Sequence, residues 1–221
     1  MQWMFIIGYA DTYMPLITLI FYFSLLDKIS GKENILLVYC VINVILFGIS
    51  NFMVYEKTNN LAIYHLQSLL EVFFSSYYIL NLLFKKSYLK WFFFISGCYF
   101  LFWICSILYI EPLKSFNGVS GSISNVIVLV LCMYYLFSLS KSDVILYFQK
   151  APSFWIISGF LICASASLLV VISYEYYVLT EHNREGMNIW LIISFATILK
   201  FALIIVGLLC YKRNSFSTHM Q

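Results

Sequence analysis

The feature that most constrains this chain is an apolar stretch, residues 61–84, that carries a stripe of polar side chains. The polar residues recur at helical spacing, and they are Tyr64, Gln67, Ser68, Glu71, Ser75, Tyr78 and Asn81. At about 100° per residue they stay within an arc of roughly 100°, which is one face of an α-helix. The other positions are mostly Leu, Val, Phe and Ile. The stretch therefore predicts a helix with one polar face in apolar surroundings.

Glu71 stands near the middle of this stretch, and its charge restricts where the helix can lie. A carboxylate at the centre of a membrane is costly unless it faces protein or water. The stretch is also long enough to cross a bilayer. We therefore expect it to form the inner wall of a membrane bundle, with Glu71 directed inward.

The composition restricts the class of protein in the same direction. Of the 221 residues, 62% are hydrophobic and 10% are charged, whereas a soluble domain has about 45–50% apolar and about 25% charged residues. These fractions indicate a polytopic membrane protein whose main partner is the lipid bilayer. The net charge of +3 is scattered along the chain, so nucleic acid is not an expected partner.

Seven apolar segments have the length of a membrane-spanning helix. They lie at about 5–26, 34–54, 61–84, 91–110, 118–139, 153–176 and 188–211. The connections between them are short and polar, which leaves no room for a soluble domain. The sequence therefore predicts an all-α fold, a single seven-helix transmembrane bundle formed by residues 1–221.

The distribution of Lys and Arg predicts the orientation of this bundle. Nine of the 13 basic residues lie in the tail and in the connections after segments one, three and five. Three lie in the other connections. Because basic residues collect on the cytoplasmic side, we expect the N-terminus outside and the C-terminus in the cytoplasm. Four tryptophans then fall at the two interfaces as expected anchors: Trp3 and Trp190 outside, Trp91 and Trp155 inside.

Two opposite charges lie at similar depth in this arrangement. At 1.5 Å per residue, Glu71 lies about 15 Å below the outer boundary and Lys200 about 18 Å below it. Either charge alone is costly in the membrane, so the depths predict an ion pair between them. Such a pair either fixes the register of the helices or belongs to a functional site, and the sequence leaves both readings open.

Further polar residues lie nearer the outer boundary. Asp11 and His65 are roughly 9 and 6 Å deep by the same geometry, and Glu175 stands at the outer end of its segment. We expect these residues to surround the mouth of an outward-facing pocket, with Tyr9 and Tyr174 as further lining. The alternatives are an interfacial position for Asp11 and Glu175 and a simple interhelical hydrogen bond for His65. The predicted ligand-binding residues are Glu71, Lys200, His65, Asp11, Gln67 and Tyr64.

Lys200 lies halfway along the seventh segment, where the lysine of the rhodopsins carries retinal as a Schiff base, and Glu71 takes the place of a counter-ion. The resemblance implies retinal on Lys200 as an alternative. However, Ala196 stands where the usual microbial pattern has Asp, and residues 61–84 lack a run of the Arg-Tyr-x-x-Asp-Trp type. The sequence itself predicts no cofactor.

Enzyme and metal chemistry find little support in the residues. His65 is the only one of three histidines inside a predicted span, which is too few for a zinc site with three or four ligands. No GxSxG, HExxH or phosphate-loop motif occurs. We therefore expect no metal site and no assigned catalytic residue, although an intramembrane enzyme stays as a further alternative.

Two short runs resemble small uncharacterised seven-helix inner-membrane proteins of bacteria. One run extends from Asn59 to Glu71, with the sequence NNLAIYHLQSLLE, and the other from Pro152 to Gly159, with the sequence PSFWIISG. The resemblance implies a bacterial inner-membrane location and the seven-helix plan, and it implies no activity.

These observations favour a receptor-like or regulatory membrane protein. It would bind a small ligand or lipid in the outward pocket and signal through a membrane or cytoplasmic partner. A transporter or channel component is the alternative, in which the Glu, Lys and His side chains within the membrane move protons or ions.

Overall fold

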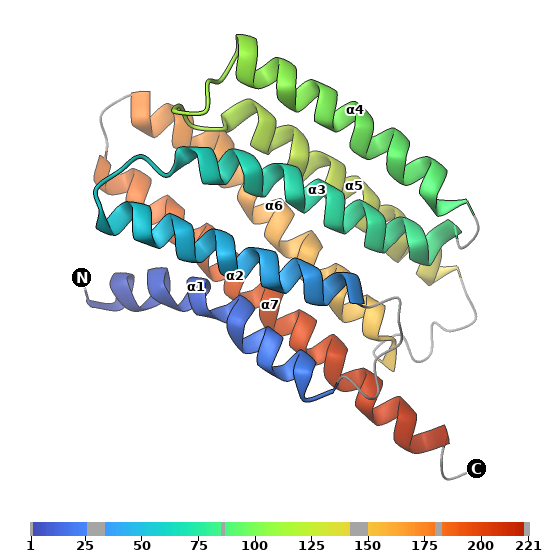
Figure 1. Ribbon diagram of the computed structural model, residues 1–221. Coiled ribbons are helices and arrows are strands. Elements are labelled where there is room, and N and C mark those ends of the chain that lie inside the picture. Colours follow the sequence, from blue (N-terminus) through green and yellow to red (C-terminus); the bar gives the residue numbers. More distant parts are fainter. Residues whose placement is uncertain (1, 26–33, 85–86, 142–149, 180–182, 219–221) are drawn as a thin grey trace.

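The computed structural model describes the backbone of residues 2–25, 34–84, 87–141, 150–179 and 183–218 (Figure 1). Side chains are described for residues 10–25, 34–84, 87–141, 150–173 and 190–211. These parts of the chain form seven α-helices and no strand: α1 (Gln2–Phe23), α2 (Asn34–Tyr55), α3 (Leu61–Phe84), α4 (Tyr88–Tyr109), α5 (Gly118–Ser140), α6 (Pro152–Leu179) and α7 (Asn183–Thr218). The prediction of an all-helical fold is confirmed.

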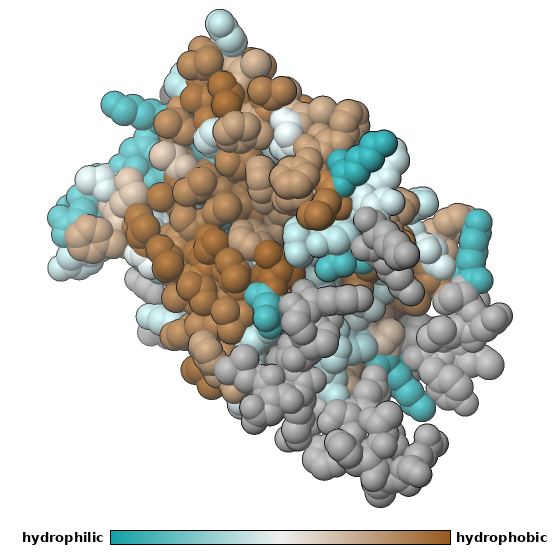
Figure 2. Space-filling view, turned by 45° about the vertical axis from the view of Figure 1, so that its right-hand side comes forward, coloured by the Kyte–Doolittle hydropathy of each residue, from teal (hydrophilic) through white to brown (hydrophobic). Residues whose placement is uncertain are grey.

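Six of these helices, α2 to α7, are long and apolar enough to cross a membrane, and the searched apolar part of α1, Ala10–Phe23, is shorter. Large apolar side chains such as Phe93, Leu101 and Leu169 are exposed on the outside of the bundle. Figure 2 shows apolar surface over the middle of one face, with hydrophilic residues toward its margins. Extensive exposed apolar surface of this kind marks a surface that faces lipid. The helices indicate a multi-pass membrane protein.

The helices form a ring of six with one helix outside it. Around the ring, α1 packs against α2, α2 against α3, α3 against α5, α5 against α6, α6 against α7, and α7 against α1. The remaining helix, α4, packs against α3 and α5. Because α4 lies outside the ring, the space within the bundle is bounded by the other six helices.

The two ends of the bundle differ in which helix termini they hold (Figure 1). One end, which we call the N-terminal end, holds the starts of α1, α3, α5 and α7 and the last turns of α2, α4 and α6. The opposite end, the C-terminal end, holds the last turn of α7 near the C-terminus. The segment 110–117, which joins α4 to α5, therefore lies at the N-terminal end.

Glycines on α6 and α7 bring these two helices into close contact. A Cβ atom on Gly159 would lie 2.9 Å from the carbonyl oxygen of Lys200, and one on Gly207 would lie 2.7 Å from Cγ1 of Ile156. Both distances are too short for a side chain, so α6 and α7 pack backbone against backbone at Gly159 and backbone against side chain at Gly207. The small residues Gly159, Cys163 and Ser167, spaced four residues apart, predict a close helix contact on this side of α6. Gly159 makes that contact and so positions α7, and with it Lys200, within the bundle.

A proline shapes the helix that carries Asp11. Pro15 lies inside α1, and it has no N–H to donate to the carbonyl oxygen of Asp11, four residues earlier. Figure 1 shows that α1 changes direction in its middle. The N-terminal half of α1, with Asp11, therefore follows a different line from its C-terminal half.

Candidate functional site

Glu71 and Lys200 form the ion pair that their depths predict. The Lys200 Nζ atom lies 3.2 Å from Oε1 and 3.4 Å from Oε2 of Glu71. The side chain of Lys200 is 4% exposed and that of Glu71 is 15% exposed. The pair joins α3 to α7 across the interior of the ring, which is where two unmatched charges would be most costly.

Tyr39 on α2 completes this pair. Its hydroxyl group donates a hydrogen bond of 2.7 Å to Oε2 of Glu71 and accepts one of 2.7 Å from Nζ of Lys200. Hydrogen bonds to charged groups are shorter and stronger than neutral ones. Three helices thus meet at one polar cluster, which we call the Tyr39–Glu71–Lys200 cluster.

Aromatic rings close the space below this cluster, toward the C-terminal end. The ring of Tyr39 lies 5.5 Å from those of Phe74 and Phe160 and 6.1 Å from that of Phe201. Nζ of Lys200 lies 5.2 Å from the ring centre of Phe201, within cation–π range. Below these rings the described core is buried and mainly apolar, and its apolar members are Leu36, Ile79, Leu80, Ile156, Ile157, Ile204 and Leu208. The cluster therefore rests on a dry floor.

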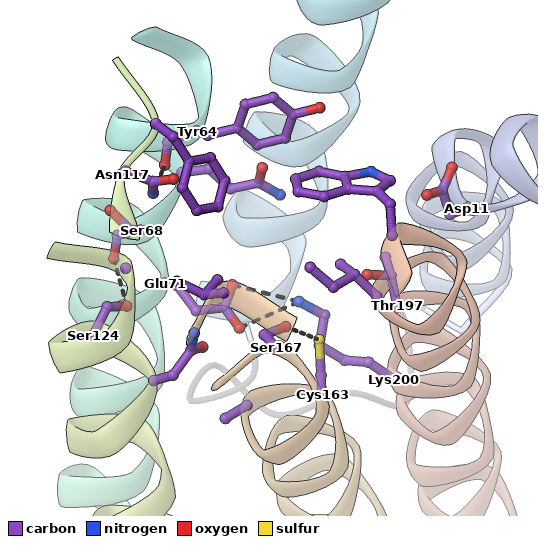
Figure 3. Close-up of a pocket in the computed structure, with 18 of the residues that line it drawn as sticks. Asp11, Tyr64, Ser68, Glu71, Asn117, Ser124, Cys163, Ser167, Thr197 and Lys200 are labelled. Atoms are coloured by element: carbon purple, nitrogen blue, oxygen red, sulfur yellow. Dashed lines mark hydrogen bonds and ion pairs between the residues drawn. The ribbon is translucent and has the colours of Figure 1, made fainter. Parts of the chain in front are cut away.

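Above the cluster lies a cavity of about 130 Å³, which is large enough for several water molecules. All six helices of the ring contribute to it, and α4 contributes no lining residue. Its lining includes six uncharged polar side chains beside apolar ones, namely Gln67, Ser68, Ser124, Asn125, Ser167 and Thr197. Figure 3 shows Glu71 and Lys200 paired with each other at the cavity, with Ser167 beside them. The upper half of the polar stripe on α3, from Tyr64 to Glu71, thus lines the cavity.

Three aromatic side chains stand at the upper end of the cavity. The ring of Trp190 on α7 lies 5.3 Å from that of Tyr64 and 6.4 Å from that of Phe116, in edge-to-face geometry. All three residues line the cavity. The indole of Trp190, expected as an interfacial anchor, thus packs on residues of the cavity. We call Tyr64, Phe116 and Trp190 the aromatic mouth.

The segment 110–117 is held over the start of α3 by side-chain hydrogen bonds. Nδ2 of Asn117 donates to the carbonyl oxygen of Tyr64 over 3.1 Å, and Nδ2 of Asn59 donates to that of Lys114 over 3.0 Å. These bonds place Phe116 and Asn117 at the cavity. A connection between two helices thus supplies part of the candidate site.

Glu111, in the same segment, stabilises the start of α5. Its carboxylate accepts hydrogen bonds from the backbone N–H groups of Val119 and Ser120 and from the hydroxyl group of Ser120. A carboxylate at a helix N-terminus satisfies otherwise unpaired donors and complements the helix dipole. Glu111 is buried, and it was not among the charged residues that the sequence singled out.

His65 is the predicted site residue that the structure does not bring to the cavity. It lies about 120° around α3 from Glu71, at 100° per residue. Its imidazole is fully buried, and Nε2 makes a hydrogen bond of 3.1 Å with the carbonyl oxygen of Ser115. That acceptor requires the proton on Nε2, so His65 helps to hold the segment 110–117 in place.

The structure brings the other predicted site residues to one cavity. Tyr64, Gln67 and Glu71 line it, as do Lys200 and Asp11. Figure 3 shows Asp11 on α1, well apart from Glu71 and Lys200. The side chains of Tyr9, Tyr174 and Glu175, which were also expected near the pocket, lie outside the described residues.

The groups that line the cavity suit the binding of a small ligand. Among the described residues, no group of three or more His, Cys, Asp or Glu side chains is placed to hold a metal ion. Lys200 already contacts Glu71 and Tyr39, and these contacts hold its amine in place. The cavity offers a carboxylate, amides, hydroxyl groups and aromatic rings, which are the groups that fix the orientation of a small ligand. Comparisons of the chain with protein families, curated proteins and solved structures gave no match.

Proposed function

We propose that this protein is a receptor-like or regulatory protein of a bacterial inner membrane. Its seven helices all span the bilayer, with the N-terminus outside and the C-terminus in the cytoplasm, as the distribution of basic residues favours. It binds a small ligand or lipid in the cavity above Glu71 and Lys200 and passes the signal to a partner protein. This function rests on topology and on the site together, since a fold alone does not fix an activity.

The observation that carries the proposal is the asymmetry of the cavity. Its upper end is lined by the aromatic mouth at the N-terminal end of the bundle, and its lower end rests on the buried rings of Tyr39, Phe160 and Phe201. A ligand can enter such a cavity from one side, whereas an ion path needs polar groups through the whole membrane. The dry floor therefore favours binding over conduction.

A ligand in this cavity contacts residues that join several helices of the bundle. Glu71, Lys200 and Tyr39 lie on three different helices, and the first two line the cavity. A ligand that binds the Glu71 carboxylate changes the strength of the contacts that hold α2, α3 and α7 together. Differential binding to two arrangements of these helices is what a signal requires.

Native mass spectrometry of the protein, extracted from its membrane in mild detergent, tests this function. We expect a bound small molecule or lipid on the unaltered protein and its loss in Ser167→Phe, which fills the cavity. Val130→Phe on the exposed face of α5 is the matched control and should retain the ligand. In liposomes, we expect no proton flux. Flux that depends on Glu71 would replace this proposal with transport.

A further inference from the structure

The charges that line the cavity do not cancel. Two carboxylates, those of Asp11 and Glu71, stand against one ammonium group, that of Lys200. With both carboxylates ionised, the described lining carries one negative charge in excess. In a cavity with low-dielectric walls, one uncompensated charge produces a potential that selects ligands by sign.

The positive charge of Lys200 is already engaged. Its ammonium group has three N–H donors, and three acceptor atoms lie within reach: the hydroxyl oxygen of Tyr39 at 2.7 Å and the two Glu71 oxygens at 3.2 and 3.4 Å. The Lys200 side chain is only 4% exposed. An anionic ligand would have to break these contacts to reach it.

The carboxylate of Glu71, in contrast, keeps capacity to accept. Its two oxygens offer about four acceptor positions, and Tyr39 and Lys200 supply three contacts. The side chain is 15% exposed and lines the cavity. A donor in the cavity can therefore reach Glu71 without displacing its partners.

The aromatic mouth favours the same kind of ligand. The rings of Tyr64, Phe116 and Trp190 surround the way from the N-terminal end to Glu71. The face of an aromatic ring attracts a cation, and Trp does so most strongly. Aromatic rings combined with a carboxylate form a site for an ammonium group.

We propose that the cavity binds an organic ammonium ion, whose charged head lies between the carboxylate of Glu71 and the rings of the aromatic mouth. Asp11 at the rim contributes to the negative potential. This inference rests on the proposed function, because it names the class of ligand that the same cavity takes. It applies to amines and quaternary ammonium compounds alike, since both present a cation to the carboxylate and the rings.

Two thiol reagents of similar size and opposite charge test this sign selectivity without knowledge of the natural ligand. One carries a trimethylammonium group and the other a sulfonate group, each on an ethyl methanethiosulfonate. The labelled position is Ser167→Cys in the cavity, in a chain where Cys163 is changed to Ala. The same chain without Ser167→Cys measures the reaction of the remaining cysteines. Thr58→Cys, exposed at the N-terminal end between α2 and α3, is the control outside the cavity.

We expect the cationic reagent to label Ser167→Cys at least about tenfold faster than the anionic reagent, after each rate is divided by that at Thr58→Cys. Asp11→Asn, which cancels the excess charge, should reduce this preference. Asn125→Cys on α5 repeats the measurement if Ser167→Cys does not fold.

Two other results would each overturn a different part of the account. Equal rates, or faster labelling by the sulfonate, would exclude a cation-selective cavity while leaving an accessible binding site. If neither reagent labels the cavity positions while both label Thr58→Cys, the cavity is closed to small molecules, and the proposed function fails with it.

Discussion

Lys200 lies near the middle of an apolar helix. Its charge is tolerated there because side chains from two other helices pair with it. Glu71 on α3 supplies the opposite charge, and Tyr39 on α2 supplies a hydroxyl group that bonds to both. Removal of one member of a buried pair leaves the other charge without compensation, which costs more than the pair contributes. The Tyr39–Glu71–Lys200 cluster is therefore a point where a single substitution has a large effect.

Tyr39→Phe removes the hydroxyl group and keeps the ring packing with Phe74, Phe160 and Phe201. Because hydrogen bonds to two charged groups are lost, we expect the free energy of unfolding to fall by at least about 1.5–3 kcal/mol, the range for one such bond. The control is Tyr135→Phe, whose buried hydroxyl group donates to the neutral hydroxyl of Ser153 over 2.6 Å. It should cost about 0.5–1.5 kcal/mol. Unfolding in mixed detergent micelles measures the free-energy loss of both variants. Equal losses would show that the Tyr39 hydroxyl group does not bond to the charged pair.

Glu71→Gln and Lys200→Met test the ion pair as a double-mutant cycle. Each single change leaves one buried charge unmatched and should cost about 3–5 kcal/mol of unfolding free energy. The double variant removes both charges, so its loss should be smaller than the sum of the single losses by at least about 1 kcal/mol. Additive losses in the same unfolding measurement would show that the two side chains do not interact.

The residues of this cluster differ in how far the sequence reveals them. Glu71 and Lys200 are predictable because charges are rare in apolar segments and helical rise gives their depth. Tyr39 is not, because tyrosine is common throughout this chain, and nothing marks one tyrosine among 18. Its spacing of four residues from Asn43 was the available signal, since both lie on the buried face of α2.

At the scale of elements, the contact of α6 with α7 sets the position of Lys200. Gly159 packs against the backbone of Lys200 itself, so the distance between these helices is fixed where the ion pair forms. The small-residue spacing on α6 predicts a close contact, whereas its partner helix and the residue it meets follow only from the assembled bundle.

Gly159→Ala should separate α6 from α7 at Lys200, because the new Cβ atom would lie 2.9 Å from a carbonyl oxygen. We expect a loss of about 1–3 kcal/mol in unfolding free energy. Gly97→Ala on α4 is the matched control, since nothing lies within 4 Å of its Cβ position. It should be neutral or stabilising by up to about 1 kcal/mol. Thermal unfolding of the two variants in detergent compares them directly, and similar midpoints would contradict the close contact.

The contribution of segment 110–117 to the site could not be predicted from sequence patterns. Helical periodicity predicts helices and which face they bury, but a connection has no period. Here a connection brings Phe116 and Asn117 to the cavity and is tied down by His65 and Asn59. The role of His65 follows from this contact, which no local pattern contains.

At the scale of the whole molecule, the six-helix ring encloses a cavity that has the aromatic mouth at one end and buried rings at the other, among the described residues. The polar residues of α3 continue past Glu71 to Ser75 and Tyr78, but these are buried among apolar side chains rather than along a channel. We infer that the interior is reached from the N-terminal end and closed toward the C-terminal end.

Sided labelling in sealed membrane vesicles tests this claim most directly. Three cysteine variants are compared with a membrane-impermeant thiol reagent: Gln67→Cys in the cavity, Thr58→Cys at the N-terminal end and Ser87→Cys at the C-terminal end. We predict that Gln67→Cys reacts from the same side as Thr58→Cys and does not react from the side that labels Ser87→Cys. Reaction of Gln67→Cys from the Ser87 side, or from both sides at similar rates, would contradict a cavity with a closed floor.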